Sequence, residues 1–345
     1  MPALTLAYVG GYTTEDRNGR APGITVYRTG QPGESWTALQ VLDAGENPSL
    51  LRFGPGDATL YAVHGARTDV SAYAMDAATG LLKPAGRANS GGTNPVDLGV
   101  WPGRPALLTV HYTSGTAAVL ALRPDGTPCE PATVLPFRRE GHPGPSMPHG
   151  VTFDPSGRFA LVPDKGLDCV WVLTLGPDNS LAVAGLGACD PGSGPRHCAF
   201  HPVLPVLYVV NELGCSVQSF RWEDGALHPL QVASSLPPGA KGVAAEIAVS
   251  PDGRSVYVSN RGHDSVAHFA VENGTGRLGP ATCTPCGGAE PRLFALSPDG
   301  RTLHVCCQDS HRIVSFPLDE SGRPGSGTVS AEVGSPTALC FRSAS

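Results

Sequence analysis

Histidine, arginine and glutamate side chains recur at corresponding points of this chain, and these residue types bind anions and move protons. The guanidinium group of arginine offers two parallel donors to a carboxylate or phosphate, so several arginines in one place predict an anionic ligand. Histidine and glutamate beside them exchange protons near neutral pH. The side chains in question are His149, Arg196, His197, Glu212, Glu246, Arg261, His263 and Arg292. They are far apart in sequence, so a fold must bring them together.

A repeat supplies that fold. Six times the chain gives a short apolar strand, a Pro/Gly/Asp turn and a second apolar strand, most clearly in residues 148–164 and 245–260. The repeats start at Pro48, Pro95, Pro148, Pro195, Ala245 and Pro291. Their starts lie roughly 45 to 53 residues apart, which is the period of four-stranded propeller blades. Further strand-like segments follow most of the repeats, and helical periodicity is nearly absent.

The two ends of the chain complete a seventh unit. Residues 336–341 resemble a lone first strand, whereas residues 4–9, 23–27 and 36–42 resemble a second, third and fourth strand. Joining them closes the ring and removes the exposed sheet edge of an open array. We therefore predict an all-β, seven-bladed β-propeller closed by pairing the C-terminal strand with the N-terminal strands, and a single domain over residues 1–345.

The geometry of a propeller blade predicts where in the fold a site would lie. The first strand lies nearest the axis, and the hairpin returns the second strand to the starting face, so first-strand starts and second-strand ends meet at one mouth of the central channel. All the side chains named above fall at these two points. Polar residues at the same level that we expect instead to form turns and hydrogen bonds between blades are Asp164, Asp168, Asp264 and Asn211.

Composition excludes some classes of function and partner. The formal net charge is −6, which argues against a nucleic-acid-binding protein. No stretch approaches the ~20 apolar residues of a membrane span, and the first ten residues show no signal-peptide pattern. Several of the cysteines fall in apolar strands, where a reduced cysteine acts as a small apolar residue. We expect a cytoplasmic protein without nucleic-acid or membrane partners.

The segment Cys283-Thr284-Pro285-Cys286 has the CxxC spacing of zinc and redox sites. Both kinds of site need further partners, and no second CxxC or HxxxH follows. We interpret the segment as a loop between blades.

At these residues the chain resembles the seven-bladed lactonase family, which includes bacterial 6-phosphogluconolactonases and fungal carboxymuconate cycloisomerases. The matching motifs are Pro148-His149-Gly150, Gly194-Pro195-Arg196-His197, Asn211-Glu212-Leu213, Ala245-Glu246-Ile247 and Asn260-Arg261-Gly262-His263-Asp264. The resemblance covers essentially the whole chain. It departs from the family at Lys165, where a leucine is more common, and at Cys306-Cys307-Gln308, where an alanine-asparagine pair is typical. We expect neither departure to touch the central cluster.

The resemblance implies a catalytic set of His149, Arg196 and Glu212. In lactone hydrolysis, Glu212 or His149 is expected to activate water, with the other acting as acid, while Arg196 stabilises the oxyanion. The expected substrate-binding residues are His197, Glu246, Arg261, His263 and Arg292, which would hold the phosphate or carboxylate of an anionic lactone. We expect no metal and no cofactor.

Three alternatives stay open at this level. A cycloisomerase on the same scaffold needs the same arginines and one proton donor. A metal-dependent lactonase needs carboxylate and asparagine ligands, but Arg and His outnumber Asp and Glu at the predicted mouth. A non-catalytic propeller that binds a partner across its face is the third.

Overall fold

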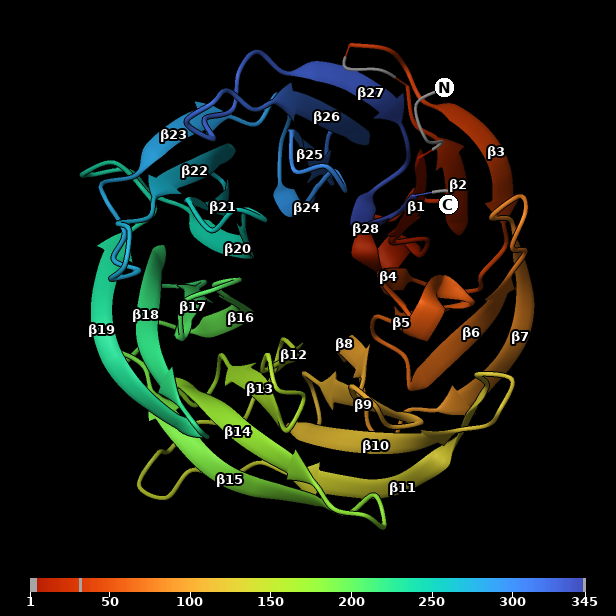
Figure 1. The fold of residues 1–345 in the computed structure, drawn as a ribbon. Coiled ribbons are helices and arrows are strands. Elements are labelled where there is room, and N and C mark those ends of the chain that lie inside the picture. The colour runs from red at the N-terminus through yellow and green to blue at the C-terminus, as the bar shows by residue number, and fades with distance from the viewer. Residues whose placement is uncertain (1–4, 31–32, 344–345) are drawn as a thin grey trace.

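The computed structural model describes residues 5–30 and 33–343 and has seven four-stranded antiparallel sheets arranged around a central channel (Figure 1). The innermost, first strands are β4 (Pro48–Phe53), β8 (Pro95–Val100), β12 (Thr152–Phe153), β16 (Pro195–Phe200), β20 (Val243–Val249), β24 (Pro291–Leu296) and β28 (Pro336–Ser343). The second strands are β5 (Thr59–His64), β9 (Ala106–His111), β13 (Phe159–Asp164), β17 (Val206–Asn211), β21 (Ser255–Arg261), β25 (Thr302–Cys307) and β1 (Thr5–Gly11).

The two outer strands of each blade follow in chain order. The third strands are β6 (Asp69–Met75), β10 (Thr116–Leu122), β14 (Cys169–Leu175), β18 (Ser216–Glu223), β22 (Ser265–Ala270), β26 (Arg312–Pro317) and β2 (Ile24–Arg28). The fourth strands are β7 (Leu82–Asn89), β11 (Pro128–Pro136), β15 (Leu181–Ala188), β19 (Ala226–Ser234), β23 (Thr282–Pro285), β27 (Thr328–Glu332) and β3 (Thr37–Leu42). The predicted seven-bladed, all-β architecture is confirmed.

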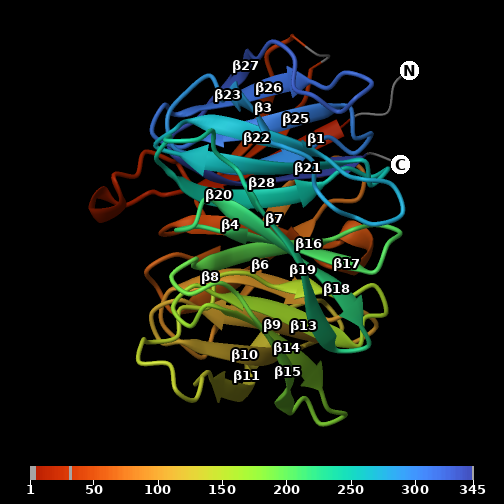
Figure 2. The same cartoon turned by 90° about the vertical axis from the view of Figure 1, so that its left-hand side faces the viewer.

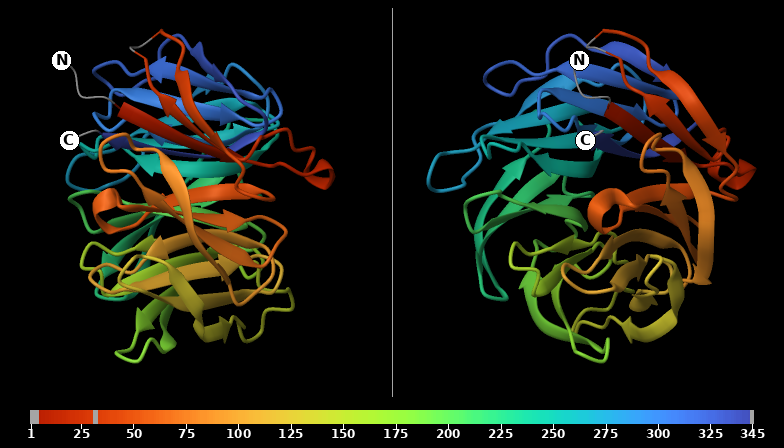
Figure 3. Two further views of the ribbon diagram at one scale, coloured as in Figure 1. Left: turned by 90° about the vertical axis from the view of Figure 1, so that its right-hand side faces the viewer. Right: turned by 45° about the vertical axis from the view of Figure 1, so that its right-hand side comes forward.

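The last blade contains both ends of the chain. β28 pairs antiparallel with β1 over Thr5↔Ser343 to Gly11↔Pro336, so the C-terminal strand is the first strand of the N-terminal sheet. Leu4, the predicted start of the N-terminal strand, lies outside the described residues. Two short 3₁₀ helices, η1 (Glu15–Arg17) and η2 (Pro55–Asp57), project from opposite faces of the disc (Figures 2 and 3).

The inner strands are buried because apolar side chains from adjacent blades pack between the sheets. Strands β5, β9, β13 and β17 are buried at every position, whereas the fourth strands alternate or are mostly exposed. This gradient fits a disc whose core lies between neighbouring blades and whose rim meets solvent. No helix within residues 5–30 and 33–343 is long and apolar enough to cross a membrane.

The CxxC segment spans the end of a blade. Cys283 lies in β23 and Cys286 follows that strand, so only part of the segment is the predicted loop. All ten cysteines of the chain are free thiols, although Cys286 Sγ lies 3.9 Å from Cys307 Sγ.

Asp164 shows how the polar residues near the channel hold the blades. It is buried at the end of β13, and its carboxylate accepts hydrogen bonds both from its own turn and from the segment that enters the blade. The donors are Ser146 Oγ, Met147 N, Gly166 N, Leu167 N and Trp171 Nε1.

We expect Asp164→Ala to lower the free energy of unfolding by about 3 kcal/mol, because buried donors lose their acceptor. Urea denaturation measures this loss. Asp178→Ala is the control, since the Asp178 carboxylate binds Ser180 in an exposed turn and its loss should leave the urea midpoint nearly unchanged. Equal midpoints for Asp164→Ala and wild type would contradict this structural role.

Candidate active site

A β-bulge near the start of each first strand sets which side chains face the channel. Register shifts of this kind occur beside Ser49, Val96, Arg196, Arg292 and Thr337. Two more fall between residues 148 and 152 and between residues 244 and 247. Consecutive side chains of a regular strand point to opposite faces, but a bulge re-aims one of them. Arg196 and His197 are consecutive, yet both line one channel cavity.

That small cavity, which we call the upper cavity, lies at the mouth where the first strands begin. Its volume is about 20 Å³, close to what one water molecule needs. The ionisable side chains that line it are Tyr12, His149, Arg196, His197 and Arg292. His149, Arg196, His197 and Arg292 therefore converge on one mouth, as the sequence predicted, and Tyr12 joins them there.

Glu212 lies behind this cavity as the counter-ion of three cations. Its Oε1 lies 2.6 Å from Lys165 Nζ and 3.2 Å from Arg261 Nη2, and its Oε2 lies 3.2 Å from Arg196 Nε. Burial alone would raise the pKa of the Glu212 carboxyl, but Arg196, Arg261 and Lys165 outweigh burial and lower it to about 2. A carboxylate this stable is a weak base at neutral pH, so its geometry favours holding the arginines over taking a proton.

Arg196 is the most enclosed of these cations. Its side chain is 3% exposed, and its Nη1 donates to the backbone oxygen of Ala245 at 2.6 Å. Burial lowers the pKa of Arg196 to about 10, together with repulsion from Arg292 and Arg261, so the guanidinium stays charged at neutral pH. Its Nε has no hydrogen-bond partner with good geometry among the described residues.

His149 is buried beside other positive groups. Burial holds the pKa of its imidazole well below the usual value, with contributions from Arg196, His197 and Arg292. It is therefore neutral at pH 7, and its Nδ1 has no hydrogen-bond partner in the part of the chain that is described. Its imidazole contacts the phenol ring of Tyr112 and the imidazole of His197 edge-on, at 5.7 and 5.2 Å between ring centroids.

His197 and Glu246 form a buried pair. His197 Nδ1 lies 3.0 Å from both carboxylate oxygens of Glu246. The Glu246 carboxylate also accepts from the backbone N–H of Ile247, at 3.0 Å. Burial raises the pKa of Glu246, but His197, Arg196 and Arg52 outweigh it and lower the pKa, so this carboxylate is ionised.

Gly150 makes room for this pair. A Cβ at this position would lie 2.9 Å from Arg196 O and 3.1 Å from His197 Cδ2. A larger residue would therefore crowd the backbone of Arg196 and the ring of His197.

The other predicted site residues differ in where they lie. Arg292 lines the upper cavity with its guanidinium 5.5 Å from the Tyr12 ring centroid, and no carboxylate pairs with it in the described structure. Arg261 pairs with Glu290 as well as Glu212, so it supports the cluster from outside the cavity. His263 bonds Ser265 Oγ in the turn after β21 and lines neither of the two channel cavities.

The lower cavity continues the channel below the upper one, with a volume of about 210 Å³. His197 lines both cavities, and Glu246 lines the lower one. At its far side Arg52 pairs with Asp97 at 3.4 Å, and the Arg52 side chain is 37% exposed. The lower cavity therefore reaches solvent.

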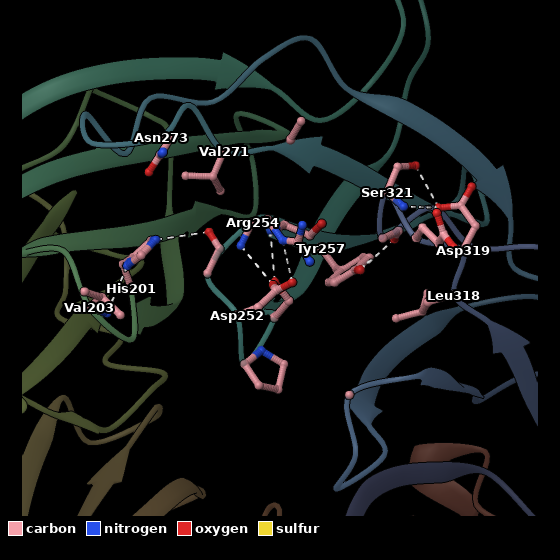
Figure 4. Close-up of a pocket in the computed structure, with 18 of the residues that line it drawn as sticks. His201, Val203, Asp252, Arg254, Tyr257, Val271, Asn273, Leu318, Asp319 and Ser321 are labelled. Atoms are coloured by element: carbon pink, nitrogen blue, oxygen red, sulfur yellow. Dashed lines mark hydrogen bonds and ion pairs between the residues drawn. The ribbon is translucent and has the colours of Figure 1, made fainter.

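A third and larger hollow lies on the opposite, turn-bearing face, with a volume of about 1200 Å³. In Figure 4 two of its acidic side chains face local partners: Asp252 contacts Arg254, and Asp319 contacts Ser321. The buried side-chain polar atoms that lack hydrogen bonds in the described structure belong to other residues: His111, His149, Ser193, Arg196, Asn211, Arg261 and Gln308. All of these lie near first-strand starts or second-strand ends, which favours the channel mouth over the hollow as the reactive site.

Lys165 corrects an expectation from the sequence. We expected it not to touch the central cluster, but its ammonium makes the shortest contact to Glu212 and lies 5.8 Å from the Tyr112 ring centroid. Its position just after the second strand β13, the same point that carries Glu212 after β17, was the signal that could have placed it. Tyr12 and Glu290 were likewise missed.

Potential metal ligands do not cluster in the described part of the chain. Within residues 5–30 and 33–343, no three His, Cys, Asp or Glu side chains gather closely enough to hold a metal ion.

Comparison with known proteins identifies the family. The sequence matches the family described as "Lactonase, 7-bladed beta-propeller" over residues 6–341. The chain belongs to this lactonase family. The predicted family and lactonase activity are thereby confirmed.

Relatives cover nearly the whole length. The chain is 29% identical over 330 residues to the 6-phosphogluconolactonase of Bacillus subtilis (strain 168), covering 92% of this chain and 93% of that one. It is 30% identical over 302 residues to the 6-phosphogluconolactonase of Cronobacter sakazakii, covering 86% and 87%. The structure of the periplasmic gluconolactonase of Pseudomonas aeruginosa superposes with a TM-score of 0.91 at 31% identity, covering 99% and 100%.

We expect Glu212→Gln to destabilise the protein at pH 7 by about 3 kcal/mol, because three cations lose their shared counter-ion. The lowered pKa of Glu212 also sets a pH dependence. Its stabilisation is complete above the unfolded-state value of about 4.5 and is lost as pH falls towards 2.

Urea unfolding at pH 7 and at pH 3 measures both effects. The gap between wild type and Glu212→Gln should shrink at pH 3, where part of the Glu212 stabilisation is already lost. Glu223→Gln is the control, since Glu223 pairs with Arg221 on the exposed rim. A gap that stays constant between the two pH values would show that Glu212 is not a buried ion-pair centre.

Proposed function

We propose that this lactonase hydrolyses an anionic sugar lactone of the 6-phosphogluconolactone kind at the upper cavity. The observation that carries the proposal is Arg292, a cavity-lining cation with no carboxylate partner among the described residues. Arg292 is half-buried, and a guanidinium that faces a cavity without a carboxylate partner favours an anionic ligand. The names of the Bacillus subtilis and Cronobacter sakazakii relatives support the phosphorylated substrate.

Cavity size supports an arrangement for the reactants. The upper cavity takes one water molecule and no sugar, so the lactone has to lie across its opening. In this arrangement a water molecule inside the cavity and the lactone carbonyl at its opening lie between His149, His197 and Arg196. The phosphate reaches outward to Arg292, and the reaction uses only water and the side chains of the site.

Arg196 stabilises the oxyanion that forms when water adds to the lactone carbonyl. Such a donor is worth about 3 kcal/mol in the transition state because it is already in place before charge develops. Glu212 keeps it in place together with Arg261 and Lys165. Neutral His149 lines the same cavity and offers a hydrogen bond to the lactone or the water, while His263 has no direct part in this arrangement.

We further propose a single domain over residues 1–345 and a cytoplasmic location. The closed pairing of β28 with β1 supports the first proposal. Ten free thiols support the second, because an oxidising compartment would favour joining Cys286 to the nearby Cys307. The Pseudomonas aeruginosa relative is periplasmic by name, so thiol counting on the protein isolated from its own cells would decide between the compartments.

The first experiment follows acid release from 6-phosphogluconolactone, gluconolactone and a carboxymuconolactone, with spontaneous hydrolysis subtracted and EDTA added in parallel. We expect EDTA-insensitive hydrolysis of 6-phosphogluconolactone. Arg196→Ala should lower kcat by about 100-fold through loss of oxyanion stabilisation. Turnover of the carboxymuconolactone alone would indicate a cycloisomerase, and loss of activity in EDTA would indicate a metal enzyme.

Arg292→Met tests the substrate charge. We expect kcat/KM for 6-phosphogluconolactone to fall by about 10- to 100-fold, while kcat/KM for neutral gluconolactone changes less than about threefold, because only the first substrate loses a charge-assisted hydrogen bond. Arg221→Met on the exposed rim is the matched control. An equal fall on both lactones would contradict a phosphate contact at Arg292.

A further inference from the structure

Two histidines line the upper cavity, and they differ in one respect that decides their chemistry. His149 has positive neighbours and an unbonded Nδ1, whereas His197 has a buried carboxylate on its Nδ1. An imidazole whose Nδ1–H donates to a carboxylate is fixed in one tautomer, leaves Nε2 bare, and is stabilised once it takes a proton. These are the requirements for a general base that activates water.

From this geometry we infer that His197 is the general base of the reaction and that Glu246 is its positioning residue. The inference rests on the proposed lactone hydrolysis. It gives Glu246 a role through His197 in place of direct substrate contact. It also takes the task of activating water away from Glu212 and His149.

Orientation of the His197 imidazole supports this assignment. Its Nδ1 points to Glu246, which lines the lower cavity but not the upper one. Arg196 Nη1 lies 3.4 Å from both ring nitrogens of His197. An atom along the lone pair of Nε2 would be much farther from Nδ1 than from Nε2. The guanidinium therefore does not occupy the lone-pair direction, and Nε2 is left to accept from water.

Several hydrogen bonds hold Glu246 in a position where it can orient His197. Besides His197, its carboxylate accepts from Ile247 N, and its own backbone N–H donates to Ser259 Oγ at 3.1 Å. Its side chain is 11% exposed. The bulge in β20 falls at residues 245–246, so the same device that turns Arg196 and His197 inward turns Glu246 towards them.

Titratable groups from the neighbouring first strands line the two cavities together with this pair. In the upper cavity they are neutral His149 before β12, Arg196 on β16 and Arg292 on β24, and in the lower cavity they are Arg52 on β4 and its partner Asp97 on β8. Glu246 is the carboxylate in contact with the His197 imidazole, at 3.0 Å. Replacing it by neutral glutamine removes the negative charge that would stabilise the imidazolium formed during the reaction.

The reaction balances with His197 alone moving the proton. As the water oxygen bonds to the lactone carbonyl carbon, Nε2 takes one water proton, and the carbonyl electron pair moves to the oxygen facing Arg196. The oxyanion then collapses and the ring C–O bond breaks. Nε2–H gives its proton to the departing alkoxide, and the new carboxylic acid ionises, releasing one proton to solvent.

The test compares Glu246→Gln with Asp97→Asn across pH. Asp97 occupies the same place after the bulge of its own first strand, is buried, and lines the lower cavity, but it pairs with Arg52 and not with His197. We expect Glu246→Gln to lower kcat by about 100-fold or more and to move the acid limb of the kcat profile to lower pH by at least one unit. Asp97→Asn should keep the wild-type acid limb.

A direct comparison of the histidines completes the test. The acid limb should vanish in His197→Gln and persist in His149→Gln, with thermal melting confirming that each variant is folded. An acid limb that persists in His197→Gln, or a Glu246→Gln profile that is lowered without moving, would overturn the inference while wild-type turnover upholds the lactonase. Absence of wild-type turnover on any lactone would overturn both.

Discussion

In each blade the first strand carries one residue more than its partner can pair with, close to the point where the strand begins. A regular strand would send alternate side chains into the channel and into the gap between blades. The extra residue breaks that alternation at one level of the disc only. Arg196 and His197 are thereby neighbours in sequence and neighbours in the cavity, which places the guanidinium proposed to stabilise the oxyanion beside the imidazole proposed to accept the proton.

Such a concentration of positive side chains needs an internal counter-charge. Glu212, which directly follows the second strand β17, provides this counter-charge through contacts of 2.6 to 3.2 Å with three cations. Arg261 is shared with Glu290, whereas Arg292 has no carboxylate partner among the described residues. The electrostatic balance thus leaves one cation facing the channel, which suits an anionic substrate. Glu246 is the carboxylate partner of His197, as Glu212 is the carboxylate partner of the arginines.

The fold could be predicted from sequence because each repeat is a local pattern with a fixed period. Closure followed from the same logic, since the strand at residues 336–341 had no partner except the N-terminal segment. The face of the site was also predictable, because strand starts and hairpin returns fix it. The contacts between side chains within the site could not be predicted from the sequence. Lys165 was judged by its difference from related sequences, but what matters is that it directly follows a second strand, as Glu212 does.

His263 shows the converse limit. It shares a motif with Arg261, but the turn after β21 directs it to Ser265. Roles were harder still, because they depend on which charges face a group. Glu212 and His149 are residue types that act as bases, yet the first is tied to three cations and the second is surrounded by positive neighbours. Only the three-dimensional arrangement separates them from His197.

The most direct test of this account is a crystal structure with the hydrolysis product 6-phosphogluconate. The account predicts the product at the mouth where the first strands begin, with its carboxylate within hydrogen-bond distance of Arg196 and its phosphate on Arg292. Product bound only in the hollow on the turn-bearing face, or with its phosphate away from Arg292, would contradict it.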